Sequence, residues 1–269
     1  MFGAIIGDIV GSVYEFHNFK TERPEEIELF NAEARFTDDS VMTIAIADAI
    51  LTGRDYADAV DDWGNRYPWS GYGGGFARWL RAKEKKPYGS WGNGSAMRVS
   101  PIGWAFETLE ETLVHAKRSA EFTHNHVEGI KGAQAAASAL FLARAGASKQ
   151  ELKAYVEHEF DYNLDRTTAE IRPHYQFNES CQGTVPEAII VFLESADFLH
   201  AVKLAVSIGG DTDTIACIAG GIAEAFYKRI PTELVVFAEE RLTSPMKVVI
   251  KTFRERFMDG DVALCGDVF

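Results

Sequence analysis

Two acidic segments of similar design stand near opposite ends of the chain. Residues 36–40, Phe-Thr-Asp-Asp-Ser, precede the apolar run 41–51, and residues 209–214, Gly-Gly-Asp-Thr-Asp-Thr, precede the apolar run 215–227. Helix capping explains one acid in each segment, because Asp and Thr favour the first turn of a helix. Two acids at each of two meeting helix ends would repel one another unless a cation neutralised them. The spacing alone therefore leaves capping and metal binding open.

The donor atoms of these two segments are carboxylate and hydroxyl oxygens. No cysteine accompanies them, and His124 and His126, two residues apart, cannot share one helical face as a zinc pair. Oxygen donors without such ligands select a hard divalent cation. If a metal is bound, the sequence therefore favours Mg²⁺ or Mn²⁺ over Zn²⁺.

Two further acids, Asp8 and Glu15, lie in an apolar, glycine-bearing segment near the start of the chain. If that segment is one helix, the two side chains point to the same side, two turns apart. A solvated helix face would also explain them. The apolar surroundings of Glu15 favour an active-site role for it, whereas we expect Asp8 to support the structure around the site.

Glycine-rich stretches at 71–75 and 89–94 interrupt the apolar pattern of the chain. Such loops let backbone N–H groups approach a ligand closely, and simple connection is the alternative. The second stretch also carries Trp91, whose ring is suited to stacking on a ligand, and backbone donors for a phosphate. Arg98 could pair with a phosphate, but we expect it to anchor a buried carboxylate or a loop.

Helices must position these groups, because helix signals recur along the whole chain. Three capping boxes place a hydroxyl residue three positions before a glutamate; they are Thr108 to Glu111, Ser148 to Glu151, and Thr184 to Glu187. Two proline-marked starts, an N-cap at Ser244 before Pro245 and a run that begins at Pro231–Thr232, predict two more helices. The alanine-rich stretch 129–145 predicts a helix that Gly146 ends, so that it forms a hairpin with the next helix.

Strand signals are weak by comparison. Alternating polar and apolar patterns are missing apart from short ambiguous pieces at 27–36 and 171–177. No linker or low-complexity run divides the 269 residues, and the matched acidic segments suggest that both halves close on one site. The sequence therefore predicts one compact all-α domain over residues 1–269.

Composition restricts the class of partner. A formal net charge of −13 repels nucleic acid, and no basic stripe offsets it. The first residues lack a basic region, and Asp8 and Glu15 break their apolar run, so we expect neither a signal peptide nor a membrane span, and a cytoplasmic location. Three separated cysteines form no disulfide framework or metal motif, and we interpret them as packing residues; they are Cys181, Cys217 and Cys265.

The motifs together resemble the ADP-ribosylglycohydrolase family, which includes dinitrogenase-reductase-activating glycohydrolase and the human ADP-ribosyl-acceptor hydrolases. Any one motif is weak, but their order along nearly the whole chain is specific. The motifs that carry the resemblance are Gly7-Asp8 with Gly11 and Glu15, Phe36-Thr37-Asp38-Asp39-Ser40, Gly92-Asn93-Gly94-Ser95-Ala96-Met97-Arg98, Thr123-His124, and Gly209-Gly210-Asp211-Thr212-Asp213-Thr214.

The resemblance implies an all-helical, multi-helix domain around a central binuclear site that holds two Mg²⁺ or Mn²⁺ ions. Asp213 would bridge both ions, and Glu15 and Asp39 would be catalytic. The implied metal ligands are Thr37, Asp38, Asp39, Asp211, Asp213 and Thr214. The implied substrate-binding residues are Gly73, Gly75, Gly89, Ser90, Trp91, Gly92, Asn93 and His124.

The resemblance also implies the reaction, namely hydrolysis of an N- or O-glycosidic bond between ADP-ribose and a modified protein side chain or a small molecule. Two alternatives stay open, a non-enzymatic ADP-ribose-binding protein and a hydrolase of another ribosylated metabolite. The intact acids speak against the first alternative. With 269 residues the chain is compact beside larger relatives, which leaves less room for insertions that recognise a protein acceptor. The sequence does not fix the acceptor linkage or the oligomeric state.

Overall fold

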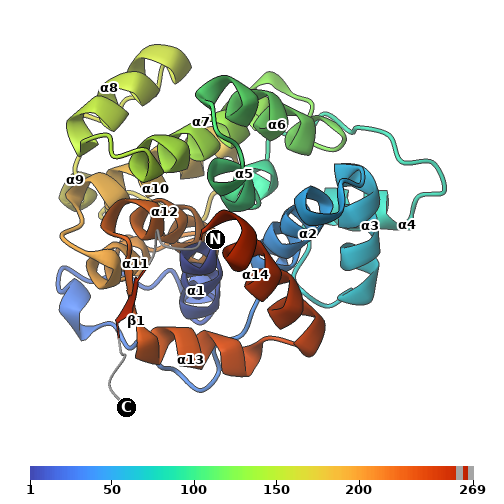
Figure 1. Ribbon diagram of the computed structural model, residues 1–269. Coiled ribbons are helices and arrows are strands. Elements are labelled where there is room, and N and C mark those ends of the chain that lie inside the picture. Colours follow the sequence, from blue (N-terminus) through green and yellow to red (C-terminus); the bar gives the residue numbers. More distant parts are fainter. Residues whose placement is uncertain (259–262, 266–269) are drawn as a thin grey trace.

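Helices build almost all of the computed structural model, which describes residues 1–258 and 263–265 (Figure 1). Within this part of the chain, 14 α-helices are joined by loops that include three 3-10 turns, η1 (Glu15–His17), η2 (Pro24–Glu26) and η3 (Asn93–Ser95). The α-helices are α1 (Phe2–Gly11), α2 (Asp38–Thr52), α3 (Tyr56–Arg66), α4 (Gly74–Arg81), α5 (Ser100–Ala105), α6 (Leu109–Glu121), α7 (Val127–Arg144), α8 (Lys149–Phe160), α9 (Thr168–Ile171), α10 (Cys181–Glu194), α11 (Phe198–Ser207), α12 (Thr212–Tyr227), α13 (Thr232–Arg241) and α14 (Ser244–Phe257).

Helix α12 forms the centre of the molecule and is packed by α1, α7, α10 and α11 (Figure 1). Its residues from Thr212 to Ala225 are all buried. A surface helix carries one apolar stripe, whereas a helix that is buried all round carries small and apolar residues on every face. The sequence of α12, TDTIACIAGGIAEAFY, has this composition. The expected single compact all-α domain is therefore confirmed for the described residues.

Glycines let α1 and α12 touch backbone to backbone. A Cβ placed on Gly7 would lie 2.0 Å from the carbonyl oxygen of Ala216, and one on Gly11 would lie 2.5 Å from the Cα of Asp213. No larger residue fits at either position without moving a helix. This close approach brings the C-terminal end of α1 to the N-terminal end of α12, where the acids of both helices lie.

The other end of α1 is capped from α12. The buried carboxylate of Glu224 accepts hydrogen bonds from the backbone N–H groups of Phe2 and Gly3, at 3.2 and 2.8 Å, and pairs with the Met1 amino group. The first N–H groups of a helix have no partner within the helix, and an anion there is favoured. Glu224 therefore holds α1 in register along α12.

Two of the three predicted capping boxes are confirmed. Thr108 and Ser148 each accept from the backbone of the glutamate three residues on, which reaches back to the N-cap backbone. The third prediction is wrong, because Thr184 lies inside α10, whose N-cap is Ser180. The hydroxyl of Thr184 instead donates to the carbonyl of Asn178 at 2.7 Å.

The other predicted helix boundaries agree closely with the structure. Helix α13 begins after Pro231 as expected, and α7 ends at Arg144, two residues before Gly146, which adopts a φ of 90°. The N-cap of α14 is Thr243, not Ser244, which is already the first helical residue. The start is shifted by one position because Pro is accepted at either of the first helical positions.

The only strands among the described residues are β1 (Arg229–Pro231) and β2 (Ala263–Cys265), which pair in parallel. Neither ambiguous sequence piece is a strand, because 27–36 forms turns and bends, and 171–177 begins with the last residue of α9 and continues without ladder partners. Cys181 and Cys217 are buried and unpaired in the described chain, as expected of packing residues, whereas the side chain of Cys265 lies outside the described set. Within the described residues, no helix is both long and apolar enough to cross a membrane.

Candidate active site and metal centre

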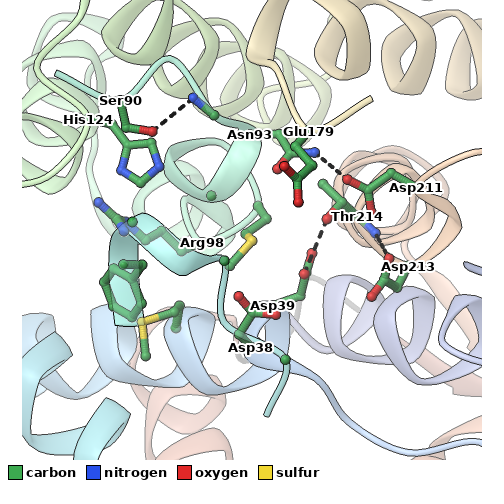
Figure 2. A pocket seen from close by; sticks show the side chains of 18 of the residues that line it. Asp38, Asp39, Ser90, Asn93, Arg98, His124, Glu179, Asp211, Asp213 and Thr214 are labelled. Carbon is green, nitrogen blue, oxygen red and sulfur yellow. Dashed lines mark hydrogen bonds between the residues drawn. The ribbon is translucent and has the colours of Figure 1, made fainter. Parts of the chain in front are cut away.

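The N-terminal ends of α2 and α12 meet at the centre of the molecule. The hydroxyl of Thr214, in the first turn of α12, donates to Oδ2 of Asp39, in the first turn of α2, at 3.2 Å (Figure 2). Gly209 and Gly210, both at φ 77°, turn the chain into α12, a conformation that other residues rarely adopt. The two acidic segments therefore share one site, as their similar design predicts.

Asp8 organises the start of α2. Its buried carboxylate accepts from the backbone N–H of Thr37 and of Ser40, each at 3.0 Å. It also accepts from the hydroxyl of Thr37 at 2.6 Å and from the hydroxyl of Ser40. The side chain of Asp8 thus satisfies N–H groups that have no partner within the helix. This position matches the supporting role expected of Asp8.

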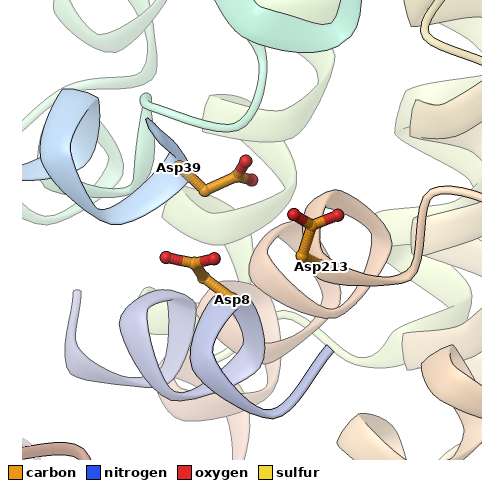
Figure 3. A group of neighbouring side chains, drawn as sticks. All are labelled: Asp8, Asp39 and Asp213. Carbon is orange, nitrogen blue, oxygen red and sulfur yellow. The ribbon is translucent and has the colours of Figure 1, made fainter. Parts of the chain in front are cut away.

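Two groups of carboxylates lie close enough to share cations. Oxygens of Asp8, Asp39 and Asp213, shown in Figure 3, lie within 4.8 Å of one another. Oxygens of Glu15, Asp211 and Asp213 form a second such group. Asp213 belongs to both groups. This is the position expected of a bridging ligand, whereas the carboxylate of Asp38 belongs to neither group. The carboxylates of Asp8 and Glu15 each belong to one of these groups, although the expected set of metal ligands did not include either residue.

The donor set fits a hard divalent cation. Every donor in the two groups is a carboxylate oxygen, which is the ligand type that Mg²⁺ and Mn²⁺ prefer. The Oδ1 atom of Asp39 is buried and has no hydrogen-bond partner among the described residues. A buried carboxylate oxygen without a partner is costly unless an ion or a proton satisfies it. The residues present therefore fit a metal centre.

Burial and mutual repulsion dominate the electrostatics of the cluster. Burial, followed by the charge of Asp213, raises the pKa of both Asp38 and Asp39 well above its usual range. Burial also raises the pKa of Asp211 to about 6 and that of Glu15 to about 8, the latter with further contributions from Asp213 and Asp8. Each carboxylate disfavours the ionisation of its neighbours. A bound cation would offset this repulsion and favour the ionised carboxylates.

Glu15 reaches the cluster from a different local structure than expected. Helix α1 ends at Gly11, four residues before Glu15, so Asp8 and Glu15 do not share one helical face. Glu15 instead begins the 3-10 turn η1, and Asn18 ends that turn in the left-handed conformation with φ 44°. The half-buried side chain therefore lies at the edge of the cluster, open to the pocket.

Asn93 joins the second glycine stretch to the acids. Its side-chain Nδ2 donates to Oδ2 of Asp211 at 2.6 Å and to the hydroxyl of Thr184 at 3.1 Å. Its backbone N–H donates to the carbonyl of Glu179 at 2.7 Å, and Gly92 forms an antiparallel bridge with Ser180. The loop before α10 therefore fixes this stretch against the acidic cluster (Figure 2).

One pocket collects most of the residues predicted for the site. Of these, Glu15, Asp38, Asp39, Gly73, Gly75, Ser90, Gly92, Asn93, His124, Asp211, Asp213 and Thr214 line its wall. Three others stand off the wall. Thr37 is turned toward Asp8, Gly89 donates its N–H to Asn125, and the half-exposed ring of Trp91 lies against His126 at 5.6 Å between centroids. Both glycine stretches thus contribute to the pocket.

The comparisons with known proteins agree with this geometry. The family model for ADP-ribosylglycohydrolase matches residues 1–258. The chain belongs to the ADP-ribosylglycohydrolase family. The resemblance drawn from the motifs is confirmed, and the protein is an ADP-ribosylglycohydrolase enzyme.

Named relatives of this glycohydrolase are similar over most of the chain. The human "ADP-ribosylhydrolase ARH3" is 28% identical, with 84% of this chain and 83% of that protein covered. The "ADP-ribosylarginine hydrolase Tri1" of Pseudomonas putida is 22% identical, with 84% and 69% covered. A solved structure titled "ADP-ribosylglycohydrolase-related protein complex" superposes with a TM-score of 0.73 at 22% identity and covers 95% of both chains, so it shares the fold.

Arg98 and His124 form one wall of the glycohydrolase pocket. The guanidinium of Arg98 donates to the carbonyl of Ser119 and, at 2.9 Å, to the hydroxyl of Thr123, so it anchors a loop rather than a carboxylate. His124 shares that hydroxyl through its Nδ1 at 2.8 Å. Burial, then the charge of Arg98, lowers the pKa of His124 well below its usual range. The imidazole is therefore neutral near pH 7.

Several wall residues were not predicted from the sequence. Tyr88, Phe177 and Glu179 have side chains that face the pocket but belong to segments without a clear pattern. Phe177 ends one of the ambiguous strand-like pieces and Glu179 stands two residues after it, so the irregularity of this piece was the only available signal. Tyr88 precedes the second glycine stretch directly, so extending that motif by one residue would have found it. The wall also contains Met42, Phe76 and Met97, together with Gly71, Gly74 and Gly94 of the two predicted glycine stretches.

Proposed function

We propose that this glycohydrolase cleaves the N- or O-glycosidic bond between ADP-ribose and an acceptor, which is a modified protein side chain or a small molecule, and that it requires two Mg²⁺ or Mn²⁺ ions. The observation that carries the proposal is the buried carboxylate cluster around Asp213, with an oxygen of Asp39 left without a partner. The names of the relatives support ADP-ribose as the group released.

The cations would be held by the two helix starts. The proposed ligands are Thr37, Asp38, Asp39, Asp211, Asp213 and Thr214, with Asp213 between the two carboxylate groups. When bound, the ions would hold the hydroxyls of the ribose and position and activate water near its anomeric carbon. Asp8 would keep the first turn of α2 in place through its hydrogen bonds to Thr37 and Ser40.

Glu15 is the proposed acid and base. Its carboxyl group lies at the pocket edge beside Asp211 and Asp213, where it is half-buried and accessible to a leaving group. A carboxylic acid in this position donates a proton to the departing acceptor atom, and its carboxylate then accepts one from water. Asp39 faces the same space, where its negative charge would stabilise the positive charge that develops on the sugar.

The remaining wall would hold the ADP part of the substrate. Backbone N–H groups of the first glycine stretch, at the start of α4, are suited to a diphosphate, because little side-chain bulk covers them. In the second stretch, the N–H groups of Gly89, Gly92 and Asn93 are already bonded within the protein, so this stretch would contribute mainly through its side chains. The proposed contacts come from Gly73, Gly75, Gly89, Ser90, Trp91, Gly92, Asn93 and His124. Neutral His124 would act as a hydrogen-bonding group rather than a charge. The net charge of −13 argues against nucleic acid as a general partner.

Release of ADP-ribose from arginine- and serine-linked conjugates, with Mg²⁺, with Mn²⁺ and with a chelator, tests the proposal. Metal-dependent release is expected from the wild type and from a control, Asp58→Asn, which removes an exposed acid of α3. The Asp213→Asn variant should show no metal-dependent release. Binding of ADP-ribose without release from any conjugate would favour a binding protein. Release from another ribosylated metabolite alone would redirect the assignment.

A further inference from the structure

A buried hydroxyl outside the pocket belongs to the hydrogen-bond network around the acidic cluster. Thr184 lies near the start of α10, is 0% exposed and does not line the active-site pocket. Its hydroxyl does not cap a helix, because Ser180 caps α10. A buried hydroxyl is costly unless it is hydrogen-bonded, so the partners of Thr184 indicate its role.

The single proton of the Thr184 hydroxyl is already used. The hydroxyl donates to the backbone carbonyl of Asn178 at 2.7 Å. The side-chain Nδ2 of Asn93 lies 3.1 Å from the same oxygen, which can act there only as an acceptor. The amide of Asn93 must therefore turn its Nδ2, and not its Oδ1, toward Thr184.

This orientation of the amide is the one that the acidic cluster requires. The same Nδ2 donates to Oδ2 of Asp211 at 2.6 Å (Figure 2). A reversed amide would place its oxygen against the carboxylate, where neither group has a proton to donate. A donor at a carboxylate favours the ionised form, and this form binds a cation. Thr184 and Asp211 thus hold the amide of Asn93 in one orientation.

The backbone around Asn93 is fixed separately from its side chain. Its N–H donates to the carbonyl of Glu179 at 2.7 Å, and Gly92 forms an antiparallel bridge with Ser180. Rotation of the Asn93 side chain is therefore the freedom that remains. Without the hydroxyl of Thr184, one N–H of the buried amide would lose its acceptor and the amide would be less firmly held.

We propose that Thr184 is a positioning residue for the metal ligand Asp211 and acts through the side chain of Asn93. This inference rests on the metal centre of the proposed function, and it adds a residue that touches neither the ions nor the substrate. Residues that hold a metal ligand in place from outside the coordination sphere typically contribute about 10- to 100-fold to metal affinity.

The two carboxylate groups give this role a distinct signature. Asp211 belongs to the group with Glu15 and Asp213 and not to the group that contains Asp39. Loss of the Thr184 hydroxyl should therefore weaken the binding of one ion and spare the ion at Asp39. A general loss of folded structure would weaken both ions, because both groups depend on the same packed helix ends.

Titration of the chelator-treated protein with Mn²⁺ tests the proposal, with binding measured by calorimetry and by the electron paramagnetic resonance signal of free Mn²⁺. Thr184→Val keeps the branched shape but removes the hydroxyl, and it should weaken one of two Mn²⁺ ions about tenfold and leave the other unchanged. Thr184→Ser keeps the hydroxyl and should bind both ions like the wild type.

Thr112→Val is the matched control. Thr112 is also 0% exposed, and its hydroxyl donates to the carbonyl of Thr108 at 2.9 Å within α6, outside the pocket lining. The substitution removes a buried hydroxyl of the same kind, so it should leave the affinity for both ions unchanged.

Wild-type affinity for both ions in Thr184→Val would overturn the proposal, as would an equal loss of both ions or reduced affinity in Thr184→Ser. If Thr184→Val does not fold, Thr184→Ala removes the same hydroxyl with a residue of higher helix propensity, and the same outcomes decide. No binding of Mn²⁺ by the wild type would refute the metal centre together with this role. A selective loss of one ion, in a protein that releases no ADP-ribose from any conjugate, would refute the proposed reaction and support the role of Thr184.

Discussion

The hydroxyl of Thr214 donates to the carboxylate of Asp39 at 3.2 Å, although 175 residues separate the two in sequence. This contact joins the first turns of α12 and α2, and each turn brings acids whose ionisation the other opposes. Burial strengthens such repulsion, because water no longer screens it. In the absence of a cation, repulsion between these carboxylates therefore destabilises the folded protein. This destabilisation can be measured.

Replacing one acid of the cluster should preserve or raise the stability of the metal-free protein while it weakens metal binding. In the presence of chelator, Asp39→Asn should unfold at the same or a higher temperature than the wild type, because one buried charge is removed. Excess Mg²⁺ or Mn²⁺ should stabilise the wild type by about 2.7 kcal/mol at one hundred times the dissociation constant. Thermal unfolding with and without metal measures both effects. A full metal-induced shift in Asp39→Asn would rule that residue out as a ligand.

Glu15→Gln separates proton transfer from metal binding. The amide keeps the shape of the side chain but neither donates an acidic proton nor accepts one. We expect kcat to fall by about 10²- to 10⁴-fold with little change in the metal-induced stabilisation. Steady-state release of ADP-ribose, combined with thermal unfolding, tests this. An unchanged kcat would remove Glu15 from the mechanism.

The main effect of Asp8→Ala should be a lower free energy of unfolding. The substitution leaves the backbone N–H groups of Thr37 and Ser40 without their acceptor, and each unsatisfied buried group costs about 1–3 kcal/mol. We expect a loss of about 3 kcal/mol in the free energy of unfolding, measured by urea titration. Asp8→Asn, which keeps one acceptor oxygen, should lose less. Equal losses in the two variants would contradict a capping role.

Gly7→Ala tests the contact between α1 and α12. The added methyl group would lie 2.0 Å from the carbonyl oxygen of Ala216, so the helices must separate. Overpacking of this kind costs about 1–3 kcal/mol or more. Gly73→Ala is the control for stability, because a Cβ at Gly73 meets no atom within 4 Å. Similar melting temperatures for Gly7→Ala and the wild type would show that the helices can shift apart without cost.

Burial of His124 should make the protein less stable as the pH decreases. Its folded-state pKa is lowered by burial, so the unfolded chain takes up a proton below its ordinary value of 6.5 while the folded protein does not. Protonation therefore favours unfolding, and stability should fall by at most about 1.4 kcal/mol per pH unit as pH decreases below this value. Urea titrations of the wild type and His124→Gln across this range isolate the effect. The same slope in both proteins would contradict it.

Sequence patterns predicted the centre of this fold better than its edges. The similar segments at 36–40 and 209–214 were expected to meet, and they do so because each opens a helix whose buried face packs into the same core. The caps at Thr108 and Ser148 were found because their signals are local. Thr184 misled the prediction, since its spacing to Glu187 mimics a capping box inside a longer helix.

The positions of Glu15, Phe177 and Glu179 could not be derived from local patterns. Helix α1 stops at Gly11 and Glu15 lies in the separate turn η1, a break that the apolar pattern of residues 1–16 does not indicate. Glu179 reaches the pocket because its carbonyl is held by Asn93, which is far away in sequence. Tertiary contacts of this kind leave no periodicity in the segments that they connect.

The backbone contact between α1 and α12 also limits the order in which parts of the chain can fold. The hydroxyl of Thr212 bonds the carbonyl of Gly11 across 201 residues, so the contact between α1 and α12 cannot form until both distant segments are present, whereas α1 can contact α2 earlier. Contacts between such distant segments slow folding, because a long loop must close before any packing repays its entropy. Segments such as the hairpin of α7 and α8, whose contacts are local, can form earlier. The acidic centre is therefore completed late in folding, when the start of α12 packs against the end of α1.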